Sequence, residues 1–172
     1  MKRFQFLLLD AGPIVKLFEL NLWERFIEMC DVSVSRIVAD QAKYASGESE
    51  DLRIDLGPYE EKIRIFDSDP SEVSVFHGKF TQEYKAIIHD GEKQTLAFLC
   101  KTRENWLFCS SDGAIFRVLG LLGRAEQGIS LEEVFTQIGF SQSGLEWQYT
   151  KKFREKYTRI GKIDSVQDKG LP

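Results

Sequence analysis

The chain has 172 residues, of which 42% are hydrophobic and 12% aromatic, and its formal net charge at pH 7 is −4. This composition is enough for the hydrophobic core of one domain and excludes a disordered chain. The acidic balance excludes a general electrostatic attraction to nucleic acid, so any such contact must come from a local basic patch.

The cysteine and histidine content indicates a reduced, zinc-free protein. Cys30, Cys100 and Cys109 include no CxxC pair, and an odd number of cysteines is typical of buried thiols in a cytosolic protein. The two histidines do not have the spacing of a zinc site. The apolar run before Asp10 is too short for a signal peptide, and no stretch approaches membrane-spanning length. We therefore expect a cytoplasmic protein with no membrane partner.

The first part of the chain predicts two strands, each followed by helical sequence. Apolar residues over 4–9 predict a buried strand, and Gly12-Pro13 suits the start of a helix because proline is favoured at the first helical position. Apolar residues at helical spacing follow, and Asn21 is expected to divide them into two helices, the second over about residues 22–29. Residues 32–35 predict a second strand, and residues 37–44 a helix.

The middle of the chain begins with a polar stretch over 46–61, which predicts a surface excursion or insertion. Alternation over 62–66 predicts a third strand. Asp67-Ser68-Asp69-Pro70 predicts a turn or helix start, and the helix that follows is expected to continue to about Ala86. Another helix is expected to begin near Glu92.

The last part of the chain predicts a strand over 106–110 and an amphipathic helix after Asp112. Ser130 and Glu133 form a capping-box pattern, which predicts a helix over 131–138. Residues 145–162 are also expected to be helical. We interpret residues 1–140 as the main domain and residues 141–172 as a C-terminal helical extension and tail.

Four acidic residues, Asp10, Asp40, Glu92 and Asp112, lie near predicted strand ends or in predicted helices. In a parallel sheet the carboxyl ends of the strands share one edge, where ligands bind. Carboxylates brought together there would repel one another unless a cation lay between them. The pattern therefore predicts a site for a divalent metal ion.

Oxygen ligands favour Mg²⁺ or Mn²⁺, and such ions suit phosphodiester hydrolysis because they activate water and stabilise the leaving oxygen. We expect Asp10 and Asp112 to be the main ligands, with Asp40 and Glu92 completing the set and Asp90 as an alternative to Glu92. Taken singly, each acid could instead be a helix cap or an ordinary surface residue.

Two further residues are candidates for substrate contact. The hydroxyl of Ser110 could hold a carboxylate or a metal-bound water, or could be a satisfied strand-end group. Arg117 could contact a substrate phosphate, although a surface or salt-bridging arginine is the commoner role. The basic stretch 151–162 contains aromatic residues at helical spacing, which favours an amphipathic helix packed on the body; its charges are secondary candidates for nucleic-acid contact.

Four short motifs resemble those of the PIN-domain family, in the same order. They begin with Asp10-Ala11-Gly12-Pro13, continue with Val38-Ala39-Asp40 and Asp90-Gly91-Glu92, and end with Ser110-Ser111-Asp112 followed by Arg117. The resemblance spans roughly residues 4–140. Asp40 stands where the family usually has glutamate.

The resemblance implies a three-layer α/β/α fold with a central parallel sheet of about four to five strands. It also implies a Mg²⁺- or Mn²⁺-dependent endoribonuclease, with RNA as the substrate, an antitoxin protein as a partner if the chain is a toxin, and a homodimer as a common assembly. We expect single-stranded or loop RNA, because a pocket at a sheet edge reaches an exposed strand more easily than a duplex groove.

Two other interpretations stay open. The first is a phosphotransferase with Asp10 as nucleophile, although Gly12 stands where haloacid-dehalogenase-like enzymes have a second aspartate. The second is a catalytically degenerate PIN-like module that binds RNA or a protein partner.

Overall fold

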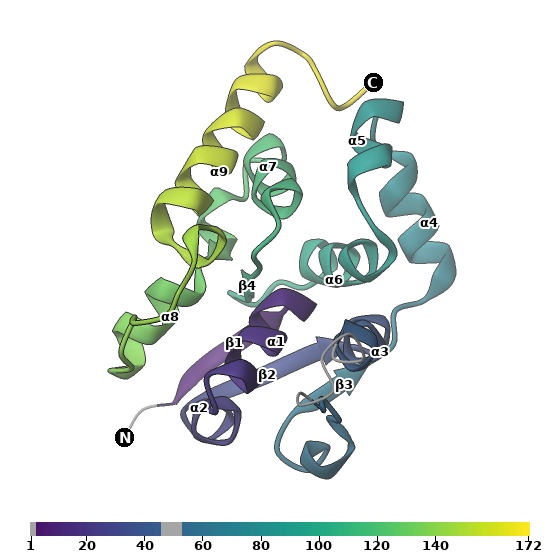
Figure 1. The fold of residues 1–172 in the computed structure, drawn as a ribbon. Coiled ribbons are helices and arrows are strands. Elements are labelled where there is room, and N and C mark those ends of the chain that lie inside the picture. The colour runs from purple at the N-terminus through teal and green to yellow at the C-terminus, as the bar shows by residue number, and fades with distance from the viewer. Residues whose placement is uncertain (1–2, 46–52) are drawn as a thin grey trace.

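The computed structural model describes residues 3–45 and 53–172, and within these residues five parallel strands form one sheet. The sheet order is β3-β2-β1-β4-β5, so β1 is central. The strands are β1 (Phe4–Leu9), β2 (Cys30–Ser35), β3 (Arg64–Phe66), β4 (Leu107–Cys109) and β5 (Gly128–Ile129). Helices cover both faces, which confirms the predicted α/β/α fold (Figure 1).

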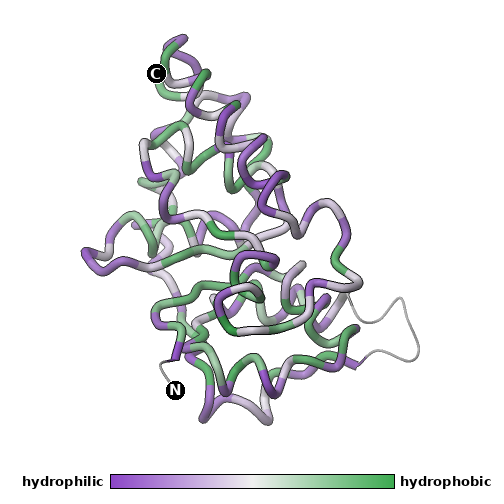
Figure 2. The backbone as a smooth tube through the Cα atoms, turned by 90° about the vertical axis from the view of Figure 1, so that its left-hand side faces the viewer, coloured by the Kyte–Doolittle hydropathy of each residue, from purple (hydrophilic) through white to green (hydrophobic). Residues whose placement is uncertain are grey.

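The alternation of side chains along β1 divides the interior into two cores. Leu7 and Leu9 belong to one hydrophobic cluster, and Leu8 belongs to the other. The helices that contribute to the first cluster are α1 (Ala11–Glu19), α2 (Trp23–Met29), α3 (Arg36–Ala45) and α8 (Leu131–Ile138). Those that contribute to the second are α4 (Pro70–Gly78), α5 (Gln82–Ile87), α6 (Asp90–Lys101) and α7 (Gly113–Leu121). Hydrophilic and hydrophobic residues alternate along the helical coils, as expected for helices that bury one side (Figure 2).

The C-terminal helix α9 (Lys151–Val166) packs along α7 (Figure 1). The two backbones approach closely at glycines: a Cβ atom at Gly161 would overlap the carbonyl oxygen of Arg117, and one at Gly120 would overlap that of Thr158. After α9 the chain returns to α5, where the backbone NH of Thr81 donates to the carbonyl oxygen of Gly170 at 2.9 Å. The predicted C-terminal extension is therefore helical and is packed against the body.

The structure differs from three of the element predictions. The strand β5 was not predicted, because two residues give no readable periodicity. The single helix expected up to about Ala86 is two helices, since the chain leaves helical geometry at Thr81, which is the N-cap of α5. In the expected surface excursion, residues 46–52 lie outside the described residues, and Ile54 and Leu56 are buried in the first core rather than exposed.

The contact between α7 and α9 predicts an unusual effect of a helix-favouring substitution. Alanine is favoured over glycine inside a helix by about 1 kcal/mol, but Gly161→Ala would force the two helices apart. We expect a net destabilisation of about 1–3 kcal/mol, seen as a loss of several degrees in melting temperature. The control is Gly78→Ala, because nothing lies near its added methyl group. Gly161→Ala melting at or above the parent temperature would show that this interface is loose.

Candidate active site

Asp10 and Asp112 meet at the carboxyl edge because β1 and β4 are neighbouring parallel strands. Leu9 pairs with Cys109, and the backbone NH of Asp10 donates to the carbonyl oxygen of Cys109 at 3.0 Å. Ser110 then connects the two acids: its hydroxyl donates to Oδ2 of Asp10 at 2.7 Å and accepts from the backbone NH of Asp112 at 2.9 Å. Ser110 is fully buried, so this link is shielded from water. Its predicted role in holding a carboxylate is consistent with these bonds.

The Asp10 side chain is only 7% exposed and has no capping hydrogen bond, although Asp10 occupies the N-cap position of α1. Burial raises the pKa of Asp10 above its usual value, and the charge of Asp112 adds to this, while the hydrogen bond from Ser110 opposes it. Simple helix capping therefore does not account for this buried carboxyl group.

Glu92 brings a third carboxyl group from the first turn of α6. Its Oε2 accepts a hydrogen bond from the backbone NH of His89 at 2.8 Å, and the side chain is 6% exposed. Burial, followed by the charges of Asp112 and Asp10, raises the pKa of Glu92 to about 8. Its bond to His89 is a helix-capping contact, and the raised pKa reflects first the burial of the side chain and then the neighbouring charges of Asp112 and Asp10.

These three acids line one cavity of about 540 Å³. The other residues around it are Ala11, Gly12, Gln41, His89, Ser111, Gly113 and Phe153. A second cavity, of about 370 Å³, shares His89, Asp112 and Gly113 with the first and extends to Tyr157. We call the two together the acidic groove. It lies where the starts of α6 and α7 and the side of α9 come together.

Two predicted acids are not among the residues that line this groove. Asp40 is exposed on α3, and the next residue, Gln41, lines the first cavity instead. Successive residues of a helix point about 100° apart, which explains how the neighbour takes the inward position. Asp90 has a side chain that is 77% exposed and pairs with Lys93 at 2.9 Å. Of the two acids in its motif, Glu92 is therefore the one that faces the cavity.

Arg117 lines the second cavity, but its guanidinium already has partners. Its Nε lies 2.7 Å from Oδ2 of Asp164, and its Nη2 lies 3.2 Å from Oε1 of Glu83. The guanidinium also lies 4.7 Å from the ring centre of Tyr84. Arg117 thus has the salt-bridging role that the sequence left open, and it links α9 to α5.

The donor chemistry of the groove fits a hard divalent cation. Oδ2 of Asp10, Oε2 of Glu92 and Oδ1 of Asp112 each accept a hydrogen bond from the protein, so a cation could be bound through the other oxygen of each group. In the parts of the chain that the structure describes, however, no three Asp, Glu, His or Cys side chains are already arranged to hold a metal ion. The residue types and their location fit, while the ligand set is incomplete.

Sequence reasoning missed Gln41 and Phe153 as residues of this site. Gln41 is one polar residue in an amphipathic helix. Phe153 lies about 40 residues after Asp112, and as an aromatic residue of the stretch 151–162 it was expected only to pack on the body. His89, which directly precedes the third motif in the sequence, lines both cavities. Gly12 also matters, because a Cβ atom there would overlap the Ser111 hydroxyl.

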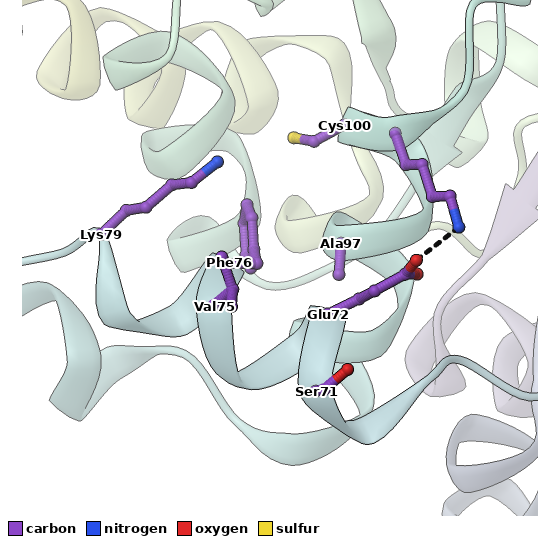
Figure 3. A pocket seen from close by; sticks show the side chains of 8 residues that line it. Ser71, Glu72, Val75, Phe76, Lys79, Ala97 and Cys100 are labelled. Atoms are coloured by element: carbon purple, nitrogen blue, oxygen red, sulfur yellow. Dashed lines mark hydrogen bonds and ion pairs between the residues drawn. The ribbon is translucent and has the colours of Figure 1, made fainter.

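A separate cavity of about 340 Å³ lies between α4 and α6 (Figure 3). Val75, Phe76 and Ala97 give it apolar walls, and the ion pair between Glu72 and Lys101 crosses its edge. It contains none of the acids predicted to form the site.

Comparisons of the chain with protein-family models, curated proteins and solved structures found no match. The resemblance to the PIN family therefore rests on the four short motifs. Among the described residues, none of the helices combines the length and apolar character needed to cross a membrane.

The raised pKa of Glu92 predicts how the stability of the metal-free protein depends on pH. A pKa that rises on folding, from 4.5 to about 8, means that the folded state holds a proton that the unfolded state releases. The stabilising effect of this proton is complete below about pH 4.5 and is lost as the pH rises through about 8. Glu92→Gln removes this titration, so we expect its melting temperature, measured in EDTA, to fall less than that of the parent between these pH values. If the melting temperatures of the two proteins changed with pH in the same way, this result would contradict the raised pKa of Glu92.

Proposed function

We propose that this protein is a divalent-metal-dependent endoribonuclease of PIN type. The observation that carries the proposal is the convergence of Asp10, Glu92 and Asp112, from three separate segments, on one cavity at the carboxyl edge of a parallel sheet. Two of these carboxyl groups have raised pKa values, which is typical of groups kept in a functional site. The order of the four motifs supports the family.

Asp10, Glu92 and Asp112 would hold Mg²⁺ or Mn²⁺, which when bound activates a water molecule and stabilises the leaving oxygen. The protein contributes rigid placement. Ser110 fixes one Asp10 oxygen, and the backbone NH of Ala114 fixes one Asp112 oxygen at 2.8 Å. His89 lies on the exposed rim of the groove, where it could contact a substrate phosphate.

The substrate we propose is RNA that is single-stranded at the cleavage site. The groove is open along its length through two adjoining cavities, which suits an extended chain better than a compact ligand. A role as the toxin of a toxin–antitoxin pair, in the cytoplasm and with an antitoxin protein as partner, follows from the family resemblance and forms part of the proposal.

A second candidate function is a degenerate PIN-like module that binds RNA without cleaving it. Two observations favour it: Asp40 does not line the cavity, and no complete ligand set is formed among the described residues. The two candidates differ in whether the groove binds a divalent ion, which can be measured directly.

Cleavage of an unstructured RNA in Mn²⁺ is the direct test of hydrolysis. We expect Asp10→Asn to reduce the rate by at least about a hundredfold, because the variant removes a central charge of the site. Asp168→Asn is the matched control, since Asp168 is exposed and has a left-handed backbone conformation that asparagine tolerates. Asp40→Asn should lower the cleavage rate by less than about tenfold, because Asp40 does not line the cavity where the metal ion would bind. Undiminished cleavage by Asp10→Asn would exclude this active site.

Metal binding has a separate signature in stability. Mn²⁺ should raise the melting temperature of the parent, because the ion binds the folded state and would replace the proton that Glu92 holds in the metal-free protein at neutral pH. Without metal at neutral pH, Asp10→Asn should melt above the parent, because the variant removes a charge that is unfavourable when buried. Thermal melts in EDTA and in Mn²⁺ measure both effects. A parent whose melting temperature is the same in both conditions would favour the degenerate module.

A further inference from the structure

The helix α9 forms one side of the acidic groove with two aromatic residues one helical turn apart. Phe153 lines the first cavity with the three acids, and Tyr157 lines the second with Asp112 and Gly113. The second cavity is also lined by Ala86 and Ile87, from the end of α5, and by His89, the N-cap of α6. The C-terminal segment is therefore part of the groove itself.

The ring of Tyr157 is held in place on one side. It lies against Gly113, where an added Cβ atom would be 2.6 Å from a ring carbon, and its centre is 4.7 Å from that of Phe153. Unlike Phe153, which is 8% exposed, Tyr157 is only half-buried. A fixed aromatic ring that is partly open to a polar groove is a surface on which a nucleobase can stack.

A positive charge lies next to this ring. The Nζ of Lys156 is 5.4 Å from the ring centre of Tyr157. Lys152, Lys156 and Arg159 recur at helical spacing on one exposed side of α9, and no ion pair binds them within the described residues. Arg154, by contrast, is committed to Glu133 through two contacts of 2.7 and 2.8 Å. The exposed cations are thus available to an external anion.

We propose that Tyr157 and Lys156 form a subsite for the nucleotide adjacent to the reacting phosphodiester of single-stranded RNA. The base stacks on Tyr157, and Lys156 contacts the neighbouring phosphate. This assignment rests on the proposed function for the identity of the ligand. It also explains how a chain of net charge −4 would hold a polyanion beside three acids, because the attraction is concentrated on one side of one helix.

The test is binding of a short fluorescein-labelled single-stranded RNA, measured by fluorescence anisotropy at several salt concentrations. It uses the Asp10→Asn background in Mg²⁺, which would prevent cleavage under the proposed function. We expect Lys156→Gln to weaken binding about tenfold and to lower the slope of log K against log salt by about 0.7, the value for one phosphate contact on a single strand. The control Lys62→Gln makes the same charge change at an exposed lysine that precedes β3 and lines neither cavity of the groove, and it should leave both quantities unchanged.

The contribution of Tyr157 is tested by a pair of substitutions with different aromatic character. Tyr157→Phe keeps the stacking face and should bind RNA like its parent, whereas Tyr157→Leu keeps apolar packing on Gly113 and should bind about tenfold more weakly. Melting curves confirm that each variant is folded. If Tyr157→Leu does not fold, the comparison of the two lysine variants still decides the assignment.

Failure of the subsite and failure of the proposed function give different results. No RNA binding, or equal effects of Lys156→Gln and Lys62→Gln, would overturn the subsite whether or not the parent cleaves RNA. RNA binding that depends on Tyr157 and Lys156, in a parent protein that does not hydrolyse RNA in Mn²⁺, would support the subsite and refute the nuclease. A duplex RNA that binds as tightly as the single strand would also overturn the subsite, because its bases are not free to stack on Tyr157.

Discussion

The candidate site depends above all on the parallel pairing of β1 with β4 and on the buried Ser110 hydroxyl that continues this pairing beyond the strand ends. The register places Leu9 beside Cys109, so Asp10 and the 110–112 turn leave the sheet together. Ser110 then uses its hydroxyl as donor to Asp10 and as acceptor from the backbone of Asp112. A hydroxyl is well suited to this position because it can donate and accept at once.

This arrangement opposes stability. Burial disfavours the charged forms of Asp10 and Glu92, and each carboxylate near Asp112 adds repulsion. A fold selected only for stability would place such groups in solvent, as it does Asp90, whose pKa is lowered by its hydrogen bond to Lys93. The contrast between two acids two residues apart on one helix supports the proposal that the buried one has a role beyond capping the helix.

The sequence predicted those parts of the site that local patterns determine. Asp10 and Asp112 follow apolar strands, and strand ends in a parallel sheet share an edge, so their proximity could be inferred. The position of Asp40 could not, because the choice between Asp40 and Gln41 depends on the rotation of α3 against the sheet. The partners of Arg117 were equally hidden, since Asp164 lies 47 residues away and is brought close only by the packing of α9. Local periodicity carries no information about such contacts.

The glycines between α7 and α9 connect the architecture to the groove. Gly120 and Gly161 allow the two backbones to approach. Gly113, at the start of α7, also lacks a side chain, and this leaves room for the ring of Tyr157. Asp112 immediately precedes Gly113. The close packing of α9 on α7 therefore sets the distance between the aromatic rings of Phe153 and Tyr157 and the carboxyl group of Asp112. Any widening of the helix contact would separate the two, and for this reason the C-terminal helix belongs to the site as well as to the fold.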